Sequence, residues 1–200
     1  MGPVIMRSFR HLTPGYIIDR LAVSRFRYRR GEKLPLFATG AIQFIESYLR
    51  DTDRVFEYGA GYSTPWLAKR AGRLISVEDW PEWYERVKLM LPGNAELILF
   101  DTTGDAYDAY IAKIRDYDPF DIVIVDGKMR AECAAAAADR LNPGGILLWD
   151  DFDPHALMWA EKFAPDILQW RRVSFDDGKV HMTGIFIKPG IIPSSTRTDM

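Results

Sequence analysis

The chain has 200 residues, of which 48% are hydrophobic and 27% charged, with a formal net charge of −2 and one cysteine, Cys133. This balance is typical of a globular protein of one domain, and no apolar run approaches the roughly 18 residues that cross a bilayer. The first residues lack the long apolar core of a secretory signal, and one cysteine cannot form an internal disulfide. The composition therefore excludes a membrane-spanning or disulfide-stabilised protein and favours a cytoplasmic one.

The charge is distributed unevenly along the chain. Residues 7–33 carry eight Lys and Arg side chains against Asp19 and Glu32, so this segment is +6 and the remainder is −8. Two interpretations are open: a solvated helix face that pairs with the acidic body, or a surface for an anionic substrate, nucleic acid or membrane. We expect three parts: a basic helical cover segment (1–37), the main domain (38–190) and a disordered tail (191–200).

The main domain alternates apolar runs with helical stretches. The predicted strands are Arg54–Tyr58, Arg73–Val77, Ala95–Phe100, Asp121–Val125 and Gly145–Trp149. Such nearly continuous Val, Ile and Leu content suits strands that helices cover on both faces. The helix predicted over Met129–Leu141 contains five consecutive alanines. After it, Asn142-Pro143-Gly144-Gly145 predicts a turn into the fifth strand.

The end of the chain breaks this alternation. Ile167–Phe175 and Lys179–Ile187 predict two strands joined by a hairpin at Asp176-Asp177-Gly178. A terminal hairpin of this kind departs from the plain dinucleotide-binding arrangement. We therefore predict an α/β fold with a mostly parallel seven-stranded sheet, a C-terminal antiparallel hairpin and helices on both faces.

A glycine-rich turn follows the first strand, in Gly59-Ala60-Gly61, and leads into a helix start. Glycines let the backbone turn sharply and approach a ligand closely. Thr64 stands where the nucleotide-diphosphate fingerprint has its third glycine, which disfavours a pyrophosphate ligand. Glu57, at the end of the strand, would repel a pyrophosphate and favour a cationic ligand. A purely structural turn with an incidental acid is the alternative.

Acids also end the second and third strands. Glu78, followed by Asp79, lies near the roughly 20-residue interval at which an acid binds ribose hydroxyls. The alternative is an acid that a helix N-terminus favours. Asp101 ends the third strand, where an adenine edge would rest, and Trp80 either packs in its helix or covers that adenine.

Three carboxylates follow the fourth and fifth strands. Asp126 ends one strand, and Asp150 and Asp151 end the next, so all three reach the carboxyl edge where ligands of open α/β sheets bind. They are a candidate site for a hard divalent cation such as Mg²⁺. In the competing interpretation, Asp126 orients the substrate or acts as general base, while Asp150 and Asp151 cap the following helix.

The glycine turn, Glu78, Asp126 and the run Asn142–Trp149 together resemble the class I S-adenosylmethionine-dependent methyltransferases, over roughly residues 38–188. The wording E-Y-G-x-G-x-S-T followed by S-V-E is similar to a bacterial branch whose substrates are mostly unassigned. The resemblance implies that the glycine turn cradles the amino acid part of the donor and that Glu78 holds its ribose. The predicted donor-binding residues are Glu57, Gly59, Gly61, Ser63, Glu78, Asp79, Asp101 and Asp126.

The three carboxylates are also similar to the metal ligands of catechol-type O-methyltransferases, which implies Mg²⁺ as an open second cofactor. In the resemblance, Asp151 replaces an asparagine. Met129 stands where that family has its catalytic lysine, and Lys128 and Arg130 lie on either side of it.

We therefore predict an enzyme that transfers a methyl group to an oxygen of a small molecule or sugar. Asp126 is the best-placed base, with Lys128 and His155 behind it. The basic segment hints at an anionic acceptor; nucleic acid is disfavoured, and a homodimer is the default assembly. A catalytically silent binding module and a nicotinamide-dependent oxidoreductase are the alternatives.

Overall fold

The computed structural model describes residues 21–22, 24–25, 33–102, 107–178 and 181–190. Most of the predicted basic cover segment and all of the predicted tail lie outside these residues. The three-part division of the chain therefore stays a prediction. Among the helices of the described residues, none is long and apolar enough to cross a membrane.

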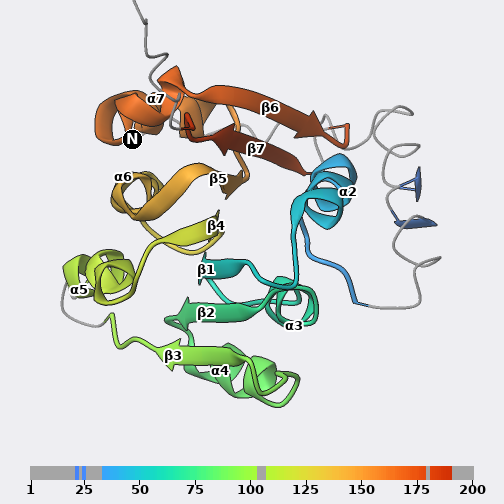
Figure 1. Cartoon of the computed structure of the whole chain (residues 1–200). Coiled ribbons are helices and arrows are strands. Elements are labelled where there is room, and N and C mark those ends of the chain that lie inside the picture. The colour runs from blue at the N-terminus through green and yellow to red at the C-terminus, as the bar shows by residue number, and fades with distance from the viewer. Residues whose placement is uncertain (1–20, 23, 26–32, 103–106, 179–180, 191–200) are drawn as a thin grey trace, which may run out of the picture.

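Seven strands form one sheet in the order β3-β2-β1-β4-β5-β7-β6 (Figure 1). They are β1 (Arg54–Tyr58), β2 (Arg73–Glu78), β3 (Ala95–Leu99), β4 (Phe120–Val125), β5 (Leu141–Asp150), β6 (Arg171–Asp176) and β7 (Met182–Ile187). Strands β1 to β5 pair in parallel, and β7 lies antiparallel to both β5 and β6. The predicted fold class is confirmed, including the antiparallel hairpin at the end.

Helices cover both faces of the sheet (Figure 1). They are α2 (Thr39–Tyr48), α3 (Ser63–Ala68), α4 (Pro81–Lys88), α5 (Tyr107–Ala112), α6 (Arg130–Arg140) and α7 (Pro154–Phe163), with the short 3₁₀ helices η2 (Lys113–Asp116) and η3 (Pro165–Gln169). Because successive strand side chains point to opposite faces, β1 contributes Phe56 and Tyr58 to one core and Val55 to the other. The first core packs on α6 and its neighbours, and the second packs on α2 and α3.

Two predicted boundaries are wrong. The strand predicted over Ile167–Phe175 begins only at Arg171, because Pro165 starts a 3₁₀ helix that buries Ile167 in the core. The turn predicted at Asn142–Gly145 lies inside β5, where the pairing shifts from Phe120 with Leu141 to Ile122 with Ile146. The glycines there form an irregularity within the strand instead of a connection before it.

The sheet places the site through its strand order. Strand β1 lies between β2 and β4, so the chain leaves β1 to one side and later returns on the other. The helices that connect the strands on one side of β1 lie on one face of the sheet, and those on its other side lie on the opposite face. This change of face opens a crevice at the carboxyl ends of the strands. The acids that end β1, β2, β4 and β5 meet at this edge.

Candidate active site

The glycine turn after β1 lies directly against the loop after β4. Gly59 has φ +89°, and a Cβ there would lie 2.5 Å from the backbone nitrogen of Gly127. A Cβ on Gly127 would in turn overlap the hydroxyl of the buried Tyr110. Two strand-end loops therefore meet backbone to backbone, which only glycine permits at Gly59.

Gly61 faces open space instead. Among the described residues, a Cβ at this position would come no closer than 3.4 Å to a neighbouring atom, Ser63 Oγ, which is an ordinary contact. A cavity of about 260 Å³ lies here, lined by Leu36, Ala60, Gly61, Tyr62, Ser63, Trp83 and Asp126. Trp83 Nε1 donates to the carbonyl of Ala60 at 2.7 Å and fixes the turn from α4. The turn is thus held in place and open on the side of the cavity.

Glu57 lies beneath this turn and has no exposed surface. Its carboxylate accepts hydrogen bonds from three hydroxyls, those of Ser63, Thr64 and Ser76. Burial raises the pKa of Glu57 to about 7, against the effect of these three donors. The carboxylate therefore supports the turn from inside the protein, and none of its surface is exposed.

This arrangement also explains the helix start after the turn. Helix α3 begins at Ser63 itself and has no side-chain cap hydrogen bond. The hydroxyls of Ser63 and Thr64 point to Glu57, and the backbone nitrogen of Gly61 donates to Thr64 Oγ1 at 2.8 Å. The threonine in the third-glycine position therefore has a structural role in this turn.

Glu78 ends β2 and is buried beside the turn. Its Oε1 accepts from the backbone nitrogens of Asp79 and Trp80, at 3.0 and 2.8 Å. Burial raises the pKa of Glu78, and these backbone donors oppose the effect. Asp101 follows β3 at the same edge and is exposed.

Asp79 and Lys128 form an ion pair, with 2.5 Å between Lys128 Nζ and Asp79 Oδ2. Thr102 Oγ1 donates to the same carboxylate at 3.1 Å. The hydrogen bond from Lys128 to Asp79 raises the pKa of the lysine. A lysine held as a cation cannot accept a proton, so this geometry argues against Lys128 as a general base.

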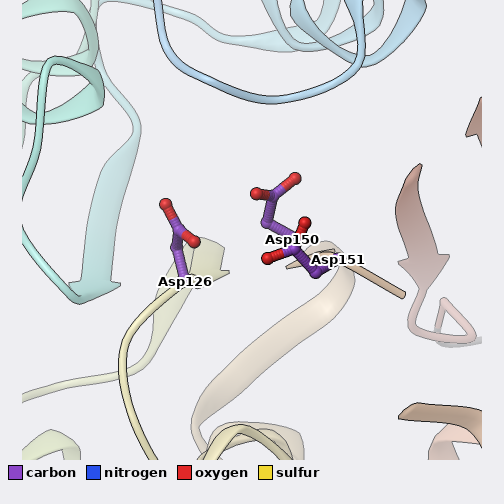
Figure 2. Close-up of side chains that lie close together, drawn as sticks. All are labelled: Asp126, Asp150 and Asp151. Atoms are coloured by element: carbon purple, nitrogen blue, oxygen red, sulfur yellow. The ribbon is translucent and has the colours of Figure 1, made fainter. Parts of the chain in front are cut away.

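The three predicted metal ligands do come together. Figure 2 shows Asp126, at the end of β4, facing Asp150 and Asp151 at the end of β5. One carboxylate oxygen of each lies within 4.8 Å of the others. Asp150 is buried and accepts from Thr183 Oγ1 at 2.8 Å, whereas Asp151 is exposed. The helix cap after β5 is Asp153, whose side chain accepts from the backbone of Ala156, so the expectation that Asp150 and Asp151 cap α7 is wrong.

Arg130 lies within this cluster. Its guanidinium donates to Asp126 Oδ1 at 3.1 Å and to Asp151 Oδ2 at 3.0 Å. Burial raises the pKa of Asp126 above the usual carboxyl range, and the charge of Arg130 opposes the effect. Burial, followed by the charge of Asp126, likewise raises the pKa of Asp150. The cluster therefore holds a proton more readily than separate aspartates would.

The donor set of the cluster suits Mg²⁺ chemically, but the arrangement does not. A cation bridging Asp126 and Asp151 would have to take the place that the Arg130 guanidinium occupies. The residues present thus do not fit a metal ion in this conformation, and no step below involves one.

A second, larger cavity opens beside the cluster, between α6 and α7. Its volume is about 480 Å³, and its lining includes Met129, Arg130, Trp149, Asp151, His155 and Trp159. Trp159 Nε1 lies 3.3 Å from His155 Nε2, and the Trp159 ring stacks on Phe163 at 5.6 Å. A partly exposed indole is thereby held in one orientation on the cavity wall.

The predicted donor-binding residues fall into two groups in the structure. Gly61, Ser63 and Asp126 line the smaller cavity. The other five lie at or near the ends of β1, β2 and β3 and do not line it: Glu57, Gly59, Glu78, Asp79 and Asp101. The sequence analysis did not identify Trp83, because no local sequence pattern marks its contact with the glycine turn. It also did not identify the ion pair between Arg130 and Asp126, which their four-residue spacing at a helix start could have indicated.

Residues 56–152 match the family model described as a methyltransferase domain. This range contains the glycine turn, Glu78 and the three-carboxylate cluster. This match identifies residues 56–152 as a methyltransferase domain. The family implies S-adenosylmethionine as the methyl donor. Among curated proteins, none matches the sequence.

Solved structures share the fold of this chain. A methyltransferase-like protein from Silicibacter pomeroyi has 20% identity and a TM-score of 0.59, over 82% of this chain and 93% of that chain. The N-methyltransferase NodS from Bradyrhizobium japonicum has 17% identity and a TM-score of 0.53, over 76% and 93%. An rRNA methylase from Streptococcus thermophilus has 18% identity and a TM-score of 0.55, over 74% and 93%. At these identities the likeness shows the fold alone.

Proposed function

We propose that the protein transfers the methyl group of S-adenosylmethionine to a hydroxyl oxygen of a small molecule, with Asp126 as the general base. One observation carries the choice of base: Asp126 is the acid that lines the cavity beside the glycine turn. Its side chain is 27% exposed, so a ligand in that cavity can reach it.

The residues around the smaller cavity fit the donor. S-adenosylmethionine, when bound, supplies an electrophilic methyl carbon on a positively charged sulfur. Gly61 leaves the space that an amino acid moiety needs, and Glu78 presents a carboxylate at the end of β2, where ribose hydroxyls would bind. Asp79 and Asp126 are paired with Lys128 and Arg130, whereas Glu78 accepts from backbone nitrogens, so Glu78 supplies the carboxylate that favours a cationic ligand at this edge.

Asp126 supports proton removal from a hydroxyl acceptor. Its Oδ1 accepts from Arg130, which leaves Oδ2 to accept the proton of the acceptor. The oxygen forms a bond to the methyl carbon as the bond from that carbon to sulfur breaks, and the proton passes to the Asp126 carboxylate. Positioning contributes most of the acceleration in such a displacement, and a general base adds about 10²- to 10⁴-fold.

The larger cavity is the proposed acceptor site. It shares Arg130 with the carboxylate cluster, and half of its lining residues are apolar, among them the indoles of Trp149 and Trp159. Glu132, Asp151 and Asp153 add carboxylates to its lining, while Arg130 is already paired. This charge balance supports a neutral acceptor with an apolar ring over the anionic one that the basic segment suggested.

Methyl transfer from isotopically labelled donor to a panel of hydroxylated small molecules tests the proposal. We expect an O-methylated product, and we expect Asp126→Asn to lower its rate by about 10²-fold or more. Asp139→Asn, an exposed position on α6, is the matched control and should leave the rate unchanged. An N-methylated product, or an Asp126→Asn enzyme of full activity, would contradict the proposal.

A further inference from the structure

We propose that Arg130 is the resident cation of the carboxylate cluster and takes the place of a divalent metal ion between Asp126 and Asp151. The cluster then binds no metal ion, because the guanidinium of Arg130 occupies the position between the carboxylates. The part of this inference that concerns cation binding stands independently of the proposed function. The part that concerns methyl transfer rests on it.

Every N–H of the guanidinium has an acceptor, five in all. Nε donates to the carbonyl of Gly127 at 3.0 Å. One terminal nitrogen donates to the Asp150 carbonyl at 2.5 Å and to Asp151 Oδ2 at 3.0 Å. The other donates to the carbonyl and the Oδ1 of Asp126, at 3.0 and 3.1 Å. The loops after β4 and β5 thus satisfy all the donors of the guanidinium, which is held in a fixed position within the site.

These contacts leave little for a metal ion. Asp126 and Asp151 each give an oxygen to Arg130, and Asp150 Oδ1 accepts from Thr183. The Thr183 hydroxyl in turn accepts from the backbone nitrogen of Ala38, so Asp150 is fixed by the segment before α2. Mg²⁺ requires six oxygen ligands near 2.1 Å, and such contacts on Asp126 and Asp151 would require the guanidinium to leave.

The local backbone brings Arg130 into this position. Met129 adopts the left-handed conformation, with φ +49°, and α6 begins at the next residue. Arg130 is four residues after Asp126, and Asp151 also has a positive φ, of 52°. Two left-handed non-glycine residues, which are uncommon, therefore flank the contact between Arg130 and the two strand ends.

This geometry gives Arg130 a positioning role as well. It holds the carbonyls of Asp126, Gly127 and Asp150, and so fixes the distance between the ends of β4 and β5. A divalent ion would join these loops through their side chains only. We therefore expect the site to keep its shape in the presence of a metal chelator.

Mn²⁺ titration, followed by electron paramagnetic resonance, tests the inference on the full chain. The wild-type protein should show no saturable Mn²⁺ site. Arg130→Met removes the charge and leaves three close carboxylates, so this variant should gain a saturable site. Adding Asp150→Asn to Arg130→Met should abolish the gain. Arg130→Gln, which keeps polar N–H donors, replaces Arg130→Met if the latter does not fold.

The possible results separate clearly. Saturable Mn²⁺ binding by the wild-type protein that Asp126→Asn abolishes would overturn the proposal, whether or not methyl transfer is ever observed. A folded Arg130 variant that gains no site would also overturn it. If methyl transfer is found, EDTA should leave its rate unchanged. A failure of methyl transfer alone would leave the Mn²⁺ result, and hence the inference, standing.

Discussion

Lys128 Nζ lies 2.5 Å from Asp79 Oδ2, and this ion pair joins the loop after β4 to the loop after β2 across the end of β1. Asp79 is nearly buried, whereas Lys128 is 56% exposed. The pair therefore closes one side of the proposed donor-binding edge, and more than half of the lysine side chain stays exposed.

Replacing Lys128 by Met should weaken donor binding by less than about tenfold, because a pair with one exposed partner contributes little. The pH dependence of methyl transfer should not change, since the ammonium is not the base. Calorimetry and a pH–rate profile check both points. Lys113→Met, which breaks an ion pair to Asp116 away from the site, is the control. A pH profile that shifts only in Lys128→Met would show that the lysine titrates in the reaction.

Gly59→Ala should abolish donor binding and lower the melting temperature. The positive φ of Gly59 alone disfavours a side chain by about 1–2 kcal/mol, and a Cβ would also collide with the Gly127 backbone. Gly93→Ala is the matched control, since a Cβ there meets nothing within 4 Å. Calorimetric titration and thermal unfolding of both variants measure the difference. Equal behaviour of the two would refute the contact between the loops.

Glu57→Gln should change how stability depends on pH. The native state keeps the Glu57 proton up to about pH 7, whereas the unfolded chain releases it near 4.5. Its contribution is therefore greatest in acid and is lost as pH rises through about 7. Relative to Glu57→Gln, the wild type should lose on the order of 3 kcal/mol between about pH 4 and pH 8. Urea unfolding measures this, with the exposed Glu82→Gln as control; a flat difference would contradict the burial of the charge.

Trp159→Ala should raise the acceptor KM by up to about tenfold and leave the donor KM unchanged, because this indole lines the larger cavity and not the smaller. Trp80→Ala is the matched control, since Trp80 is 60% exposed and lies on the side of Glu78. If Trp80 covers the adenine, its loss raises the donor KM instead. An acceptor KM that responds equally to both variants would place the acceptor elsewhere.

The sequence predicted the fold well where hydrophobic pattern and punctuation agree. The runs that end at Tyr58 and Val125 are strands buried on both faces, as their nearly continuous apolar pattern predicted. The pattern failed where local and tertiary preferences compete. Ile167 and Leu168 read as a strand, but Pro165 starts a 3₁₀ helix and Ile167 is buried in the core. The β-propensity of a segment alone does not indicate that tertiary packing will bury one of its side chains in another conformation.

The site was predictable as a set of strand ends but not as a set of contacts. Parallel pairing brings Glu78, Asp126 and Asp150 to one edge, which the sequence alone implies. Which acids reach a cavity depends on side-chain partners from distant segments. Glu57 is turned inward by Ser76, nineteen residues away, and Asp150 by Thr183, thirty-three residues away. The position of Arg130, four residues after Asp126, could have indicated the ion pair with Asp126 but not the second contact, to Asp151 after β5.

Titration of the purified protein with S-adenosylhomocysteine by calorimetry tests the central claim most directly. Glu78→Ala and Glu82→Ala are measured beside the wild type, since Glu82 is an exposed acid only four residues away. The account predicts saturable binding by the wild type and Glu82→Ala, with the affinity of Glu78→Ala reduced by about tenfold or more, as for a lost hydrogen bond to a charged group. No binding by well-folded wild-type protein, or equal binding by all three, would contradict it.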